Sequence, residues 1–247
     1  MIKTSFIFLE RIRKNKEQSL WSQGIKDWPT FLNTSKIRGI APAKKAYYNR
    51  KIHEAQQALH HDNSAYFTDK LPSTQTWRLY DYFKDDACFL DIEIDSYDRI
   101  NLIGISNYYQ TNHFVQTINL TKPQIEQELA KYKLVITFNG ASFDLPKIQK
   151  QLHLTTTIPH IDLKPLCQKL NLLGGLKEVE KTLNLKRPPH LYGNPVDLWK
   201  AFHASGDKEY LDLLLQYNAQ DIENLKAIME YCYKKMKERI SCYNLKK

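Results

Sequence analysis

The sequence predicts an α/β fold in which a mixed β-sheet carries helices on its faces, behind a small helical module at the front of the chain. Residues 87–120 hold three short runs of β-branched and aromatic residues separated by turn residues, which is typical of antiparallel strands joined by hairpins. From residue 121 onward, strand patterns alternate with helical patterns, as in the parallel part of an α/β sheet. Residues 1–60 are basic and show helical patterns.

The chain is long enough for one core and a small extra module, because it has 247 residues and 42% of them are hydrophobic. Its formal net charge is +9. Residues 1–86 hold 15 Lys and Arg against 9 Asp and Glu, whereas residues 87–247 hold 21 against 18, so the basic excess is concentrated at the front. A basic balance favours a polyanionic partner such as nucleic acid.

The cysteines lie far apart and form no CxxC pair, which indicates neither a zinc site nor a disulfide framework. They are Cys88, Cys167, Cys232 and Cys242. The first residues, MIKTSFIFLERIRK, have too short an apolar run for a secretory signal, and no stretch approaches the length of a membrane span. We therefore expect a cytoplasmic protein with reduced thiols and no membrane partner.

The pattern divides the chain into three parts. Residues 1–60 form the basic helical module, residues 61–86 look like a connector, and residues 87–240 form the sheet domain. The expected core aromatics of the module are Trp21, Trp28 and Phe31.

The sheet domain is expected to begin with three antiparallel strands. They are ACFLDIEID at 87–95, RINLIGISNYY at 99–109 and HFVQTINL at 113–120. A helix follows, with Thr121 as its N-cap and Pro123 in its first turn. The apolar run KLVITF at 133–138 predicts the next strand, and a further short strand is expected at 158–163. Helical patterns follow at 163–170, 175–183, 196–203 and 207–239.

The first strand carries two acids. Asp91 and Glu93 are two residues apart, so both carboxylates emerge on the same face, while the other positions of the strand are apolar and bury it. Two carboxylates on one face of a buried strand are costly unless a cation compensates their charge, which predicts a metal site. The alternative is an edge strand whose acidic face is solvated.

The segment ITFNGASFDLP supplies a third acid. A buried strand ends at Phe138, Asn139 and Gly140 form the turn, and Asp144 stands in the first turn of a helix. Ligands of α/β sheets bind at such strand ends, which favours a functional site at this junction. The alternative is that Asp144 only stabilises the helix N-terminus, as acids often do.

The segment LLLQYNAQDIENL reads as an amphipathic helix and supplies the fourth acid. Tyr217 and Asp221 are four residues apart, so the hydroxyl and the carboxylate point the same way. Such a pair is common on ordinary helices, and its interpretation depends on the two acidic motifs that precede it.

The three motifs, in this order, are those of the DEDDy exonucleases. The sequence resembles the ribonuclease H-like superfamily of 3′ to 5′ exonucleases, and is most similar to the YprB-type group of predicted exonucleases. The matching segments are FLDIEID, VITFNGASFDLP, PHIDLKPL, GGLKEVEKTLNLKRP and LLLQYNAQDIENL, and they cover most of residues 87–231. The resemblance implies a ribonuclease H-like mixed sheet and an exonuclease activity.

The resemblance also implies a cofactor and a role for each acid. Two divalent cations, Mg²⁺ or Mn²⁺, would bind through hard carboxylate oxygens. Asp91 would bridge both ions. Glu93 and Asp221 would complete the site of the ion that binds the attacking water, and Asp144 would serve the second ion. Tyr217 would orient the water, since a phenol with a pKa of about 10 is a poor base at neutral pH.

In related chains the N-terminal region looks like a helix-hairpin-helix module, whose glycine-containing hairpins approach the phosphate backbone. This sequence departs from that pattern in its first hairpin, where Arg-Lys-Asn at 13–15 replaces the expected glycines. The second stretch, IRGIAPAKKA, keeps Gly39 and carries Lys44 and Lys45 beside it. These two lysines are candidate nucleic-acid contacts, and the alternative is that the module is only a packed helical cap.

Two residues of the NGASFD turn are predicted to line the substrate pocket. They are Asn139 and Phe143, with Phe143 packed either on the terminal base or in the core. Asp162 is expected to be a structural acid, and Asp95 is expected to lie at the rim of the site. His160 is expected to be a hydrogen-bonded core histidine.

The segment KRPP is expected to be a solvated loop. The alternative is that Lys186 and Arg187 contact the backbone of the substrate.

The sequence therefore predicts a metal-dependent 3′ to 5′ exonuclease that releases nucleoside 5′-monophosphates from nucleic acid, with DNA and a single-stranded 3′ end favoured. Two other functions stay open: a structure-specific endonuclease on the same fold, and a catalytically silent nucleic-acid-binding module.

Overall fold

The computed structural model describes residues 1–191 and 194–245, with side chains up to residue 241. The helices are α1 (Lys14–Ser22), α2 (Trp28–Asn33), α3 (Pro42–His60), α4 (Tyr80–Phe83), α5 (Lys122–Leu129), α6 (Asp144–Leu152), α7 (Leu163–Lys169), α8 (Leu176–Thr182), α9 (Pro195–Ser205) and α10 (Lys208–Leu245). The strands are β1 (Ala87–Ile94), β2 (Ile100–Ser106), β3 (Thr111–Val115), β4 (Leu134–Thr137) and β5 (His160–Asp162). Short 3₁₀ helices are η1 (Ile2–Thr4), η2 (Ser64–Phe67), η3 (Ser73–Leu79), η4 (Lys84–Asp86) and η5 (Pro189–Leu191).

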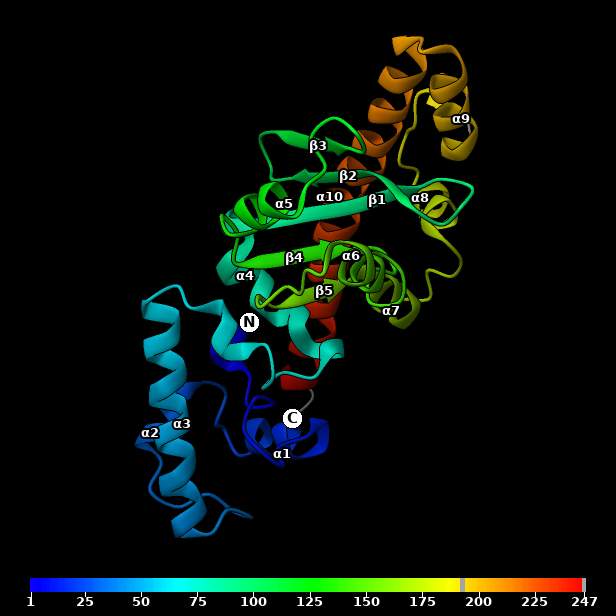
Figure 1. Ribbon diagram of the computed structural model, residues 1–247. Helices are drawn as coiled ribbons and strands as arrows, with labels where there is room; N and C mark the ends of the chain where they lie inside the picture. Colours follow the sequence, from blue (N-terminus) through cyan, green and yellow to red (C-terminus); the bar gives the residue numbers. More distant parts are fainter. Residues whose placement is uncertain (192–193, 246–247) are drawn as a thin grey trace.

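The five strands form one mixed sheet in the order β3-β2-β1-β4-β5 (Figure 1). β1 pairs antiparallel with β2, and β2 with β3, while β1 pairs parallel with β4, and β4 with β5. This arrangement confirms the predicted order of antiparallel strands followed by parallel ones. It also places β1 at the centre of the sheet, which excludes the alternative of an edge strand with a solvated acidic face.

The third strand is shorter than the predicted run 113–120. β3 ends at Val115, whose carbonyl accepts the N–H groups of Ile118, Asn119 and Leu120 in a turn. The side chain of Asn119 closes this turn by accepting from the N–H of Val115 at 2.6 Å. The alternating apolar pattern of the sequence therefore continues beyond Val115, although the backbone hydrogen bonds there change from those of a β-ladder to those of a turn.

Helices cover both faces of the sheet, as predicted. α5 and α6 lie on one face, and α10 crosses the other (Figure 1). Alternate residues of β1 enter two separate cores, since Phe89 packs with Ile222 and Leu225 of α10, whereas Leu90 packs with Ile125 of α5.

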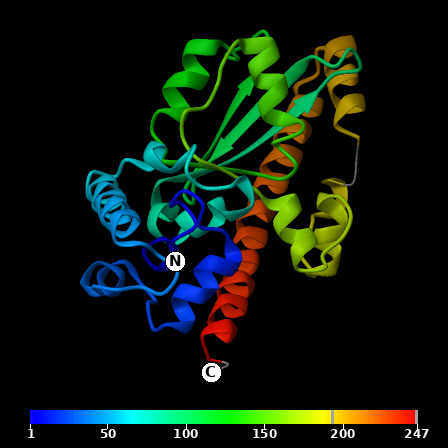
Figure 2. The same cartoon turned by 90° about the horizontal axis from the view of Figure 1, so that it is seen from below.

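α10 is the longest element, with 38 residues, and it joins the two ends of the molecule. It starts beside α9, packs on β1 and β2 of the sheet and continues to the front module, where it contacts α1 (Figure 2). No helix in the described part of the chain combines the length and the apolar character needed to cross a membrane.

The segment predicted as a connector, 61–86, is tightly packed. It consists of η2, η3, α4 and η4, and its buried aromatic residues belong to the same core as α10 and the front module. These residues are Phe67, Trp77, Tyr80 and Phe83. A buried ion pair adds to this contact, because Arg78 donates to both carboxylate oxygens of Glu17 on α1 at 3.0 and 2.9 Å. The boundaries 1–60, 61–86 and 87–240 stay a prediction.

The front module contains turns with left-handed backbone at Arg11, Gly24 and Gly39. Gly39, at φ +81°, lies in a tight turn between α2 and α3 that is closed by a bridge between Ile37 and Ile40. In the first turn Arg11 adopts φ +64°, a conformation that favours glycine. The residues at 13–15, where the first hairpin is predicted to depart from its pattern, instead lie at the start of α1.

Candidate functional site

The site is built around the centre of β1. Asp91 and Glu93 both project from the face of β1 that α10 covers, and both are half-buried. On one side, Asp91 and Glu93 pair with Gly104 and Leu102 of β2, and on the other side the pairing with β4 ends at Phe89, just before the two acids. The two acids therefore lie on one inner face of the sheet, as their spacing of two residues predicts.

A missing side chain on β2 lets α10 come close to Asp91. Gly104 pairs with Asp91 across the β1–β2 ladder, and a Cβ atom at Gly104 would lie 1.9 Å from Oδ1 of Asn218. Asn218 uses the space to donate from Nδ2 to Oδ2 of Asp91 at 2.9 Å. Asn218 was not predicted from the sequence, since an asparagine on a helix carries no local sign of a long-range partner.

α10 supplies the next acid. Asp221 follows Asn218 by one turn, and one carboxylate oxygen each of Asp91, Glu93 and Asp221 lie within 4.8 Å of one another. Tyr217 lies one turn before Asp221 on the same helix and is 4% exposed. The structure therefore brings together three of the four predicted acids around one point, with the predicted tyrosine beside them.

The fourth acid, Asp144, begins α6 and is also buried. It lies outside the group of three, but after burial and a nearer carboxylate its charge also raises the pKa of both Asp91 and Glu93. The loop before it is held by Asp162, which accepts from the N–H groups of Asn139 at 2.8 Å and Ala141 at 3.1 Å. This agrees with the predicted structural position of Asp162.

A buried arginine, Arg187, completes the site. Lys186 is exposed, as expected of a solvated loop, whereas Arg187 departs from that expectation. Its side chain is 1% exposed, and its Nη2 contacts Oδ1 of Asp221 and donates to Oε1 of Glu180 at 2.9 Å. Its guanidinium lies 5.1 Å from the ring of Tyr217, and Nζ of Lys177 lies 4.8 Å from the same ring. No local pattern marks Arg187, because its partners are 7 and 34 residues away.

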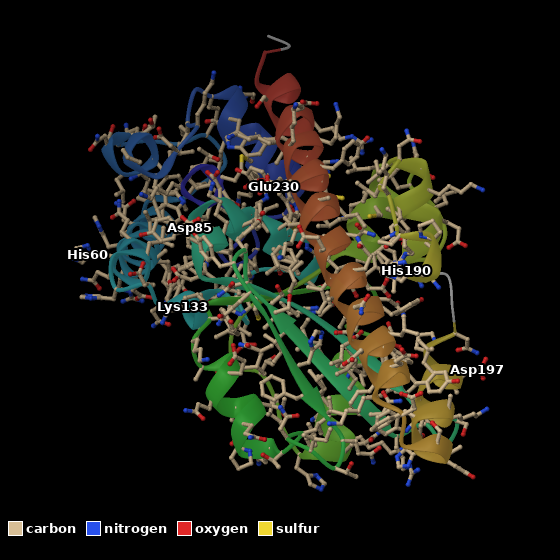
Figure 3. All side chains as sticks on the ribbon, turned by 90° about the horizontal axis from the view of Figure 1, so that it is seen from above. His60, Asp85, Lys133, His190, Asp197 and Glu230 are labelled. Carbon is tan, nitrogen blue, oxygen red and sulfur yellow. The ribbon has the colours of Figure 1, made fainter. Side chains whose placement is uncertain are left out.

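The tertiary contacts explain why Arg187 is buried. α8, which carries Glu180, and η5, which follows Arg187, both pack on α10. In Figure 3, His190 marks η5 beside α10. The chain between them must therefore run along the helix that holds Asp221, and not out into solvent.

The comparison with protein families agrees with this architecture. A family model described as the RNase_H superfamily matches residues 88–233, more than half of the chain. The chain belongs to the RNase H superfamily. The fold described above is thus the RNase H-like nuclease fold, and Asp91, Glu93, Asp144, Tyr217 and Asp221 all lie within the matched residues.

Among solved structures, this RNase H superfamily chain is similar to the family B DNA polymerase from the hyperthermophilic archaeon Pyrobaculum calidifontis, at 11% sequence identity and a TM-score of 0.49. The similar region covers 59% of this chain and 24% of that one, so the chain matches about a quarter of the polymerase. None of the curated proteins matches the sequence.

The acids of this RNase H superfamily site carry excess negative charge, although Arg187 contacts Asp221. Burial, followed by the neighbouring carboxylates, raises the pKa of Asp91 well above its usual range and that of Glu93 to about 8. Burial also raises the pKa of Asp144 to about 7, although hydrogen bonds from backbone N–H groups oppose it. For Asp221, burial outweighs the opposing charge of Arg187 and raises the pKa to about 6.

The donor set fits a divalent cation. Three carboxylate oxygens of separate residues converge in a partly buried position, and hard oxygen ligands of this kind suit Mg²⁺ or Mn²⁺. The raised pKa values point the same way, because a bound cation would compensate the repulsion that now favours protonation.

Three further residues were predicted near the site, two in the loop before α6 and one in β5. Asn139 lies in the loop next to Asp144, with a left-handed φ of +65°, and Phe143 packs partly on the core between the sheet, α5 and α6. His160 is hydrogen-bonded as predicted, since Nε2 lies 2.8 Å from Oγ1 of Thr137, but its side chain is half-buried and not part of the core; burial lowers its pKa to about 4.

Asp95 has a structural role in the turn that follows β1. Its carboxylate closes the turn between β1 and β2 by accepting from the N–H groups of Tyr97 and Arg99 and from the Arg99 guanidinium. The extra acid of the run is thus explained by the turn alone.

The two candidate lysines of the front module differ. Lys45 is 7% exposed and donates to Oδ1 of Asn49 at 3.0 Å, so its ammonium is held inside the module and is not available at the surface. Lys44 is the more exposed of the two, and its Nζ lies 4.4 Å from the ring centroid of Tyr47. The prediction that Lys45 contacts nucleic acid is therefore corrected. Its side chain lies on the face of α3 that points toward Phe31 in the core of the module.

Proposed function

We propose that the chain is a metal-dependent 3′ to 5′ exonuclease of the DEDDy type, similar to the YprB-type group. The observation that carries this proposal is the convergence of Asp91, Glu93 and Asp221 within 4.8 Å, with Tyr217 one turn from Asp221. Its products would be nucleoside 5′-monophosphates. The RNase H-like nuclease fold supports cleavage of nucleic acid in general, and the tyrosine before the last acid favours the exonuclease over the other activities.

Asp91, Glu93 and Asp221 would hold the cations, Mg²⁺ or Mn²⁺, with Asp144 at a second position. Bound divalent cations would activate a water molecule and offset the negative charge that develops on the phosphate. Asn218 would fix the orientation of Asp91 through its 2.9 Å hydrogen bond, which leaves Oδ1 of Asp91 without this partner.

Tyr217 would orient the attacking water. Burial and the charges of Asp221 and Glu93 raise the pKa of its hydroxyl, so the phenol stays protonated at neutral pH and can act only as a hydrogen-bonding group there. Its ring is fixed by burial and by two cations, Arg187 and Lys177, which is the rigidity that positioning requires.

We also propose that the front module helps to bind the nucleic acid, with Lys44 and the turn at Gly39 nearest to the phosphates. The basic excess of residues 1–86 supports this, since phosphate contacts by Lys and Arg supply most of the non-specific affinity for DNA. A single-stranded 3′ end and DNA are the favoured substrate.

The test is an end-labelling assay. Oligonucleotides of matched DNA and RNA sequence carry a label at the 5′ end and are incubated with the purified protein and Mn²⁺. A ladder shortened from the 3′ end is expected, and nucleoside 5′-monophosphates are expected among the products. A discrete internal cut would identify an endonuclease instead, and binding without any product would identify a silent binding module.

Asp91→Asn is the control for this assay. It keeps the shape of the side chain and the acceptor for Asn218 but removes one ligand charge, so we expect turnover to fall at least ~10³-fold while nucleic-acid binding stays. Activity that survives in this variant would assign the cleavage to another site or to a contaminant.

Tyr217→Phe tests the role of the hydroxyl. Because the ring and its packing remain, we expect a fall in kcat of roughly 10- to 100-fold, with KM and Mn²⁺ affinity close to those of the unchanged protein. An equal loss of Mn²⁺ affinity would mean that the tyrosine acts on the cation site and not on the water.

A further inference from the structure

Asp221 has a cation of the protein itself as a partner. Nη2 of Arg187 contacts Oδ1 of Asp221, the acid that the three-carboxylate group takes from α10. The same Nη2 donates to Glu180 at 2.9 and 3.1 Å, and Nε of Arg187 reaches Glu180 as well. The guanidinium therefore bridges an acid inside the group and an acid outside it.

The contacts of Arg187 with Asp221 and Glu180 are buried, and they join opposite charges. Arg187 and Glu180 have side chains that are 1% and 5% exposed, so water does not screen the contact. A guanidinium keeps its charge under all ordinary conditions, so it always competes for the carboxylate that it touches. Nη1 of Arg187 is also buried and has no hydrogen-bond partner in the described part of the chain, so the contacts with Asp221 and Glu180 dominate its placement.

We propose that Arg187 is a resident counter-cation of Asp221, which competes with a divalent cation for this carboxylate, and that Glu180 is the residue that retains the guanidinium. The inference rests on the part of the proposed function that makes Asp221 a cation ligand. It adds that two residues adjust the cation affinity of the site in opposite directions. Arg187 weakens cation binding, and Glu180 strengthens it by offsetting the positive charge of Arg187 beside Asp221.

The proposal assigns Arg187 a positioning role for Tyr217 as well. The guanidinium lies 5.1 Å from the Tyr217 ring, so it contacts the tyrosine and the acid of the same helix turn together. Any shift of Arg187 between Asp221 and Glu180 would change the surroundings of both residues.

Charge-removing variants on the two residues give opposite signs. Arg187→Met removes the competing charge and leaves Glu180 as an additional anion, so Mn²⁺ should bind about tenfold more tightly. Glu180→Gln leaves the arginine charge uncompensated beside Asp221, so Mn²⁺ should bind about tenfold more weakly. The double variant Arg187→Met with Glu180→Gln removes both charges, so its affinity should lie between those of the two single variants.

The measurement is a Mn²⁺ titration followed by the electron paramagnetic resonance signal of the free ion, at one pH and without nucleic acid. Thermal unfolding of each ion-free variant is recorded beside it. Asp221→Asn serves as the control that weakens binding in either background, and Arg187→Lys should keep the competing charge and so bind Mn²⁺ within about threefold of the unchanged protein.

Weaker Mn²⁺ binding in both single variants would overturn the proposal, since it is the result for a purely structural pair. Should Arg187→Met not fold, the comparison of Glu180→Gln with the double variant decides. Tighter binding in the double variant supports the competition, and equal binding refutes it. Absence of Mn²⁺ binding by the unchanged protein also refutes it. If the protein binds Mn²⁺ with these signs but degrades no nucleic acid, the exonuclease proposal fails and this inference stands.

Discussion

Asp91 depends on a glycine in the neighbouring strand. Gly104 leaves room for Asn218 between α10 and β2, and Asn218 in turn holds the carboxylate of Asp91. The central acid of the site is therefore oriented by a side chain on α10, and that contact exists only because β2 lacks a side chain at this position.

Gly104→Ala should disturb the site without touching any acid. The new Cβ would overlap Oδ1 of Asn218 at 1.9 Å and Cδ1 of Ile222 at 2.5 Å, so we expect a loss of about 1–3 kcal/mol in the free energy of unfolding and a clear loss of activity. Chemical denaturation and the end-labelling assay measure the two effects.

The double variant Gly104→Ala with Asn218→Ala is the matched control. Removing the Asn218 side chain makes space for the new methyl group, so the two changes should cost less together than the sum of the single losses in stability. If the two losses in the free energy of unfolding are strictly additive, the missing side chain at Gly104 is not what lets Asn218 and α10 approach β2.

The acids could be found from the sequence because their spacing is local. Two residues along β1 and four along α10 fix the relative directions of Asp91 and Glu93, and of Tyr217 and Asp221. Arg187 could not be found in this way. Its contact with Asp221 depends on how α8 and η5 return to α10, and no periodicity within the loop encodes that path.

Among the elements, the turn between β4 and α6 shows how a loop is fixed for Asp144. Asp162, at the end of β5, accepts from the N–H groups of Asn139, Ala141 and Lys164. One carboxylate thus joins the loop that precedes α6 to the first turn of α7.

Asp162→Ala removes an acceptor from three N–H groups at once. We expect a loss of about 2–4 kcal/mol in the free energy of unfolding, and faster hydrogen exchange at the amides of Asn139 and Ala141. Asp162→Asn keeps one acceptor oxygen, so its loss should be smaller. Unchanged exchange at these amides in the alanine variant would show that the loop is held by other contacts.

Element types were more predictable than element ends. The central strands and α10 follow long apolar patterns, and the sheet order agrees with the predicted succession of antiparallel and parallel strands. The packing of the segment 61–86 was harder to predict from the sequence. Its turn-rich composition resembles a connector, but its aromatic residues fill a gap between the front module and α10, which only the tertiary packing defines.

At the scale of the molecule, the front module and the sheet domain share one core. The buried pair Glu17–Arg78 lies where α1 meets the segment 61–86, with side chains that are 1% and 4% exposed. Because the apolar cluster runs from η1 through α4 to α10, we expect both parts to unfold in a single transition.

Arg78→Met should destabilise the whole chain, because it removes the counter-ion of the buried Glu17 carboxylate and leaves it only the Ser5 hydroxyl and the N–H of Phe6 as donors. We expect a loss of about 3–5 kcal/mol, seen equally by far-UV circular dichroism and by tryptophan fluorescence. Glu17→Leu combined with Arg78→Met should recover much of this loss. Two separate transitions in any of these variants would instead support independent folding of the module.

The four acids should make the stability of the ion-free protein depend on pH. The pKa of Glu93 is raised to about 8 and that of Asp144 to about 7, so the folded state binds protons that the unfolded state has already released. A raised carboxyl pKa stabilises the folded state fully only below the unfolded pKa, and this contribution is lost as pH rises through the folded pKa.

Between pH 7 and 8.5 we therefore expect the free energy of unfolding of the ion-free protein to fall, by on the order of 2 kcal/mol. Glu93→Gln carries no titrating group at that position, so the difference between it and the unchanged protein isolates the Glu93 contribution from every other group. This variant should be the more stable of the two at pH 8.5, and the gap should narrow toward pH 7 and close only near the pKa of an unfolded glutamate. Mn²⁺ should stabilise the unchanged protein more at pH 8.5 than at pH 7, since cation ligands must be deprotonated. A gap that stays constant with pH would show that Glu93 is ionised throughout and that its charge is already compensated within the fold.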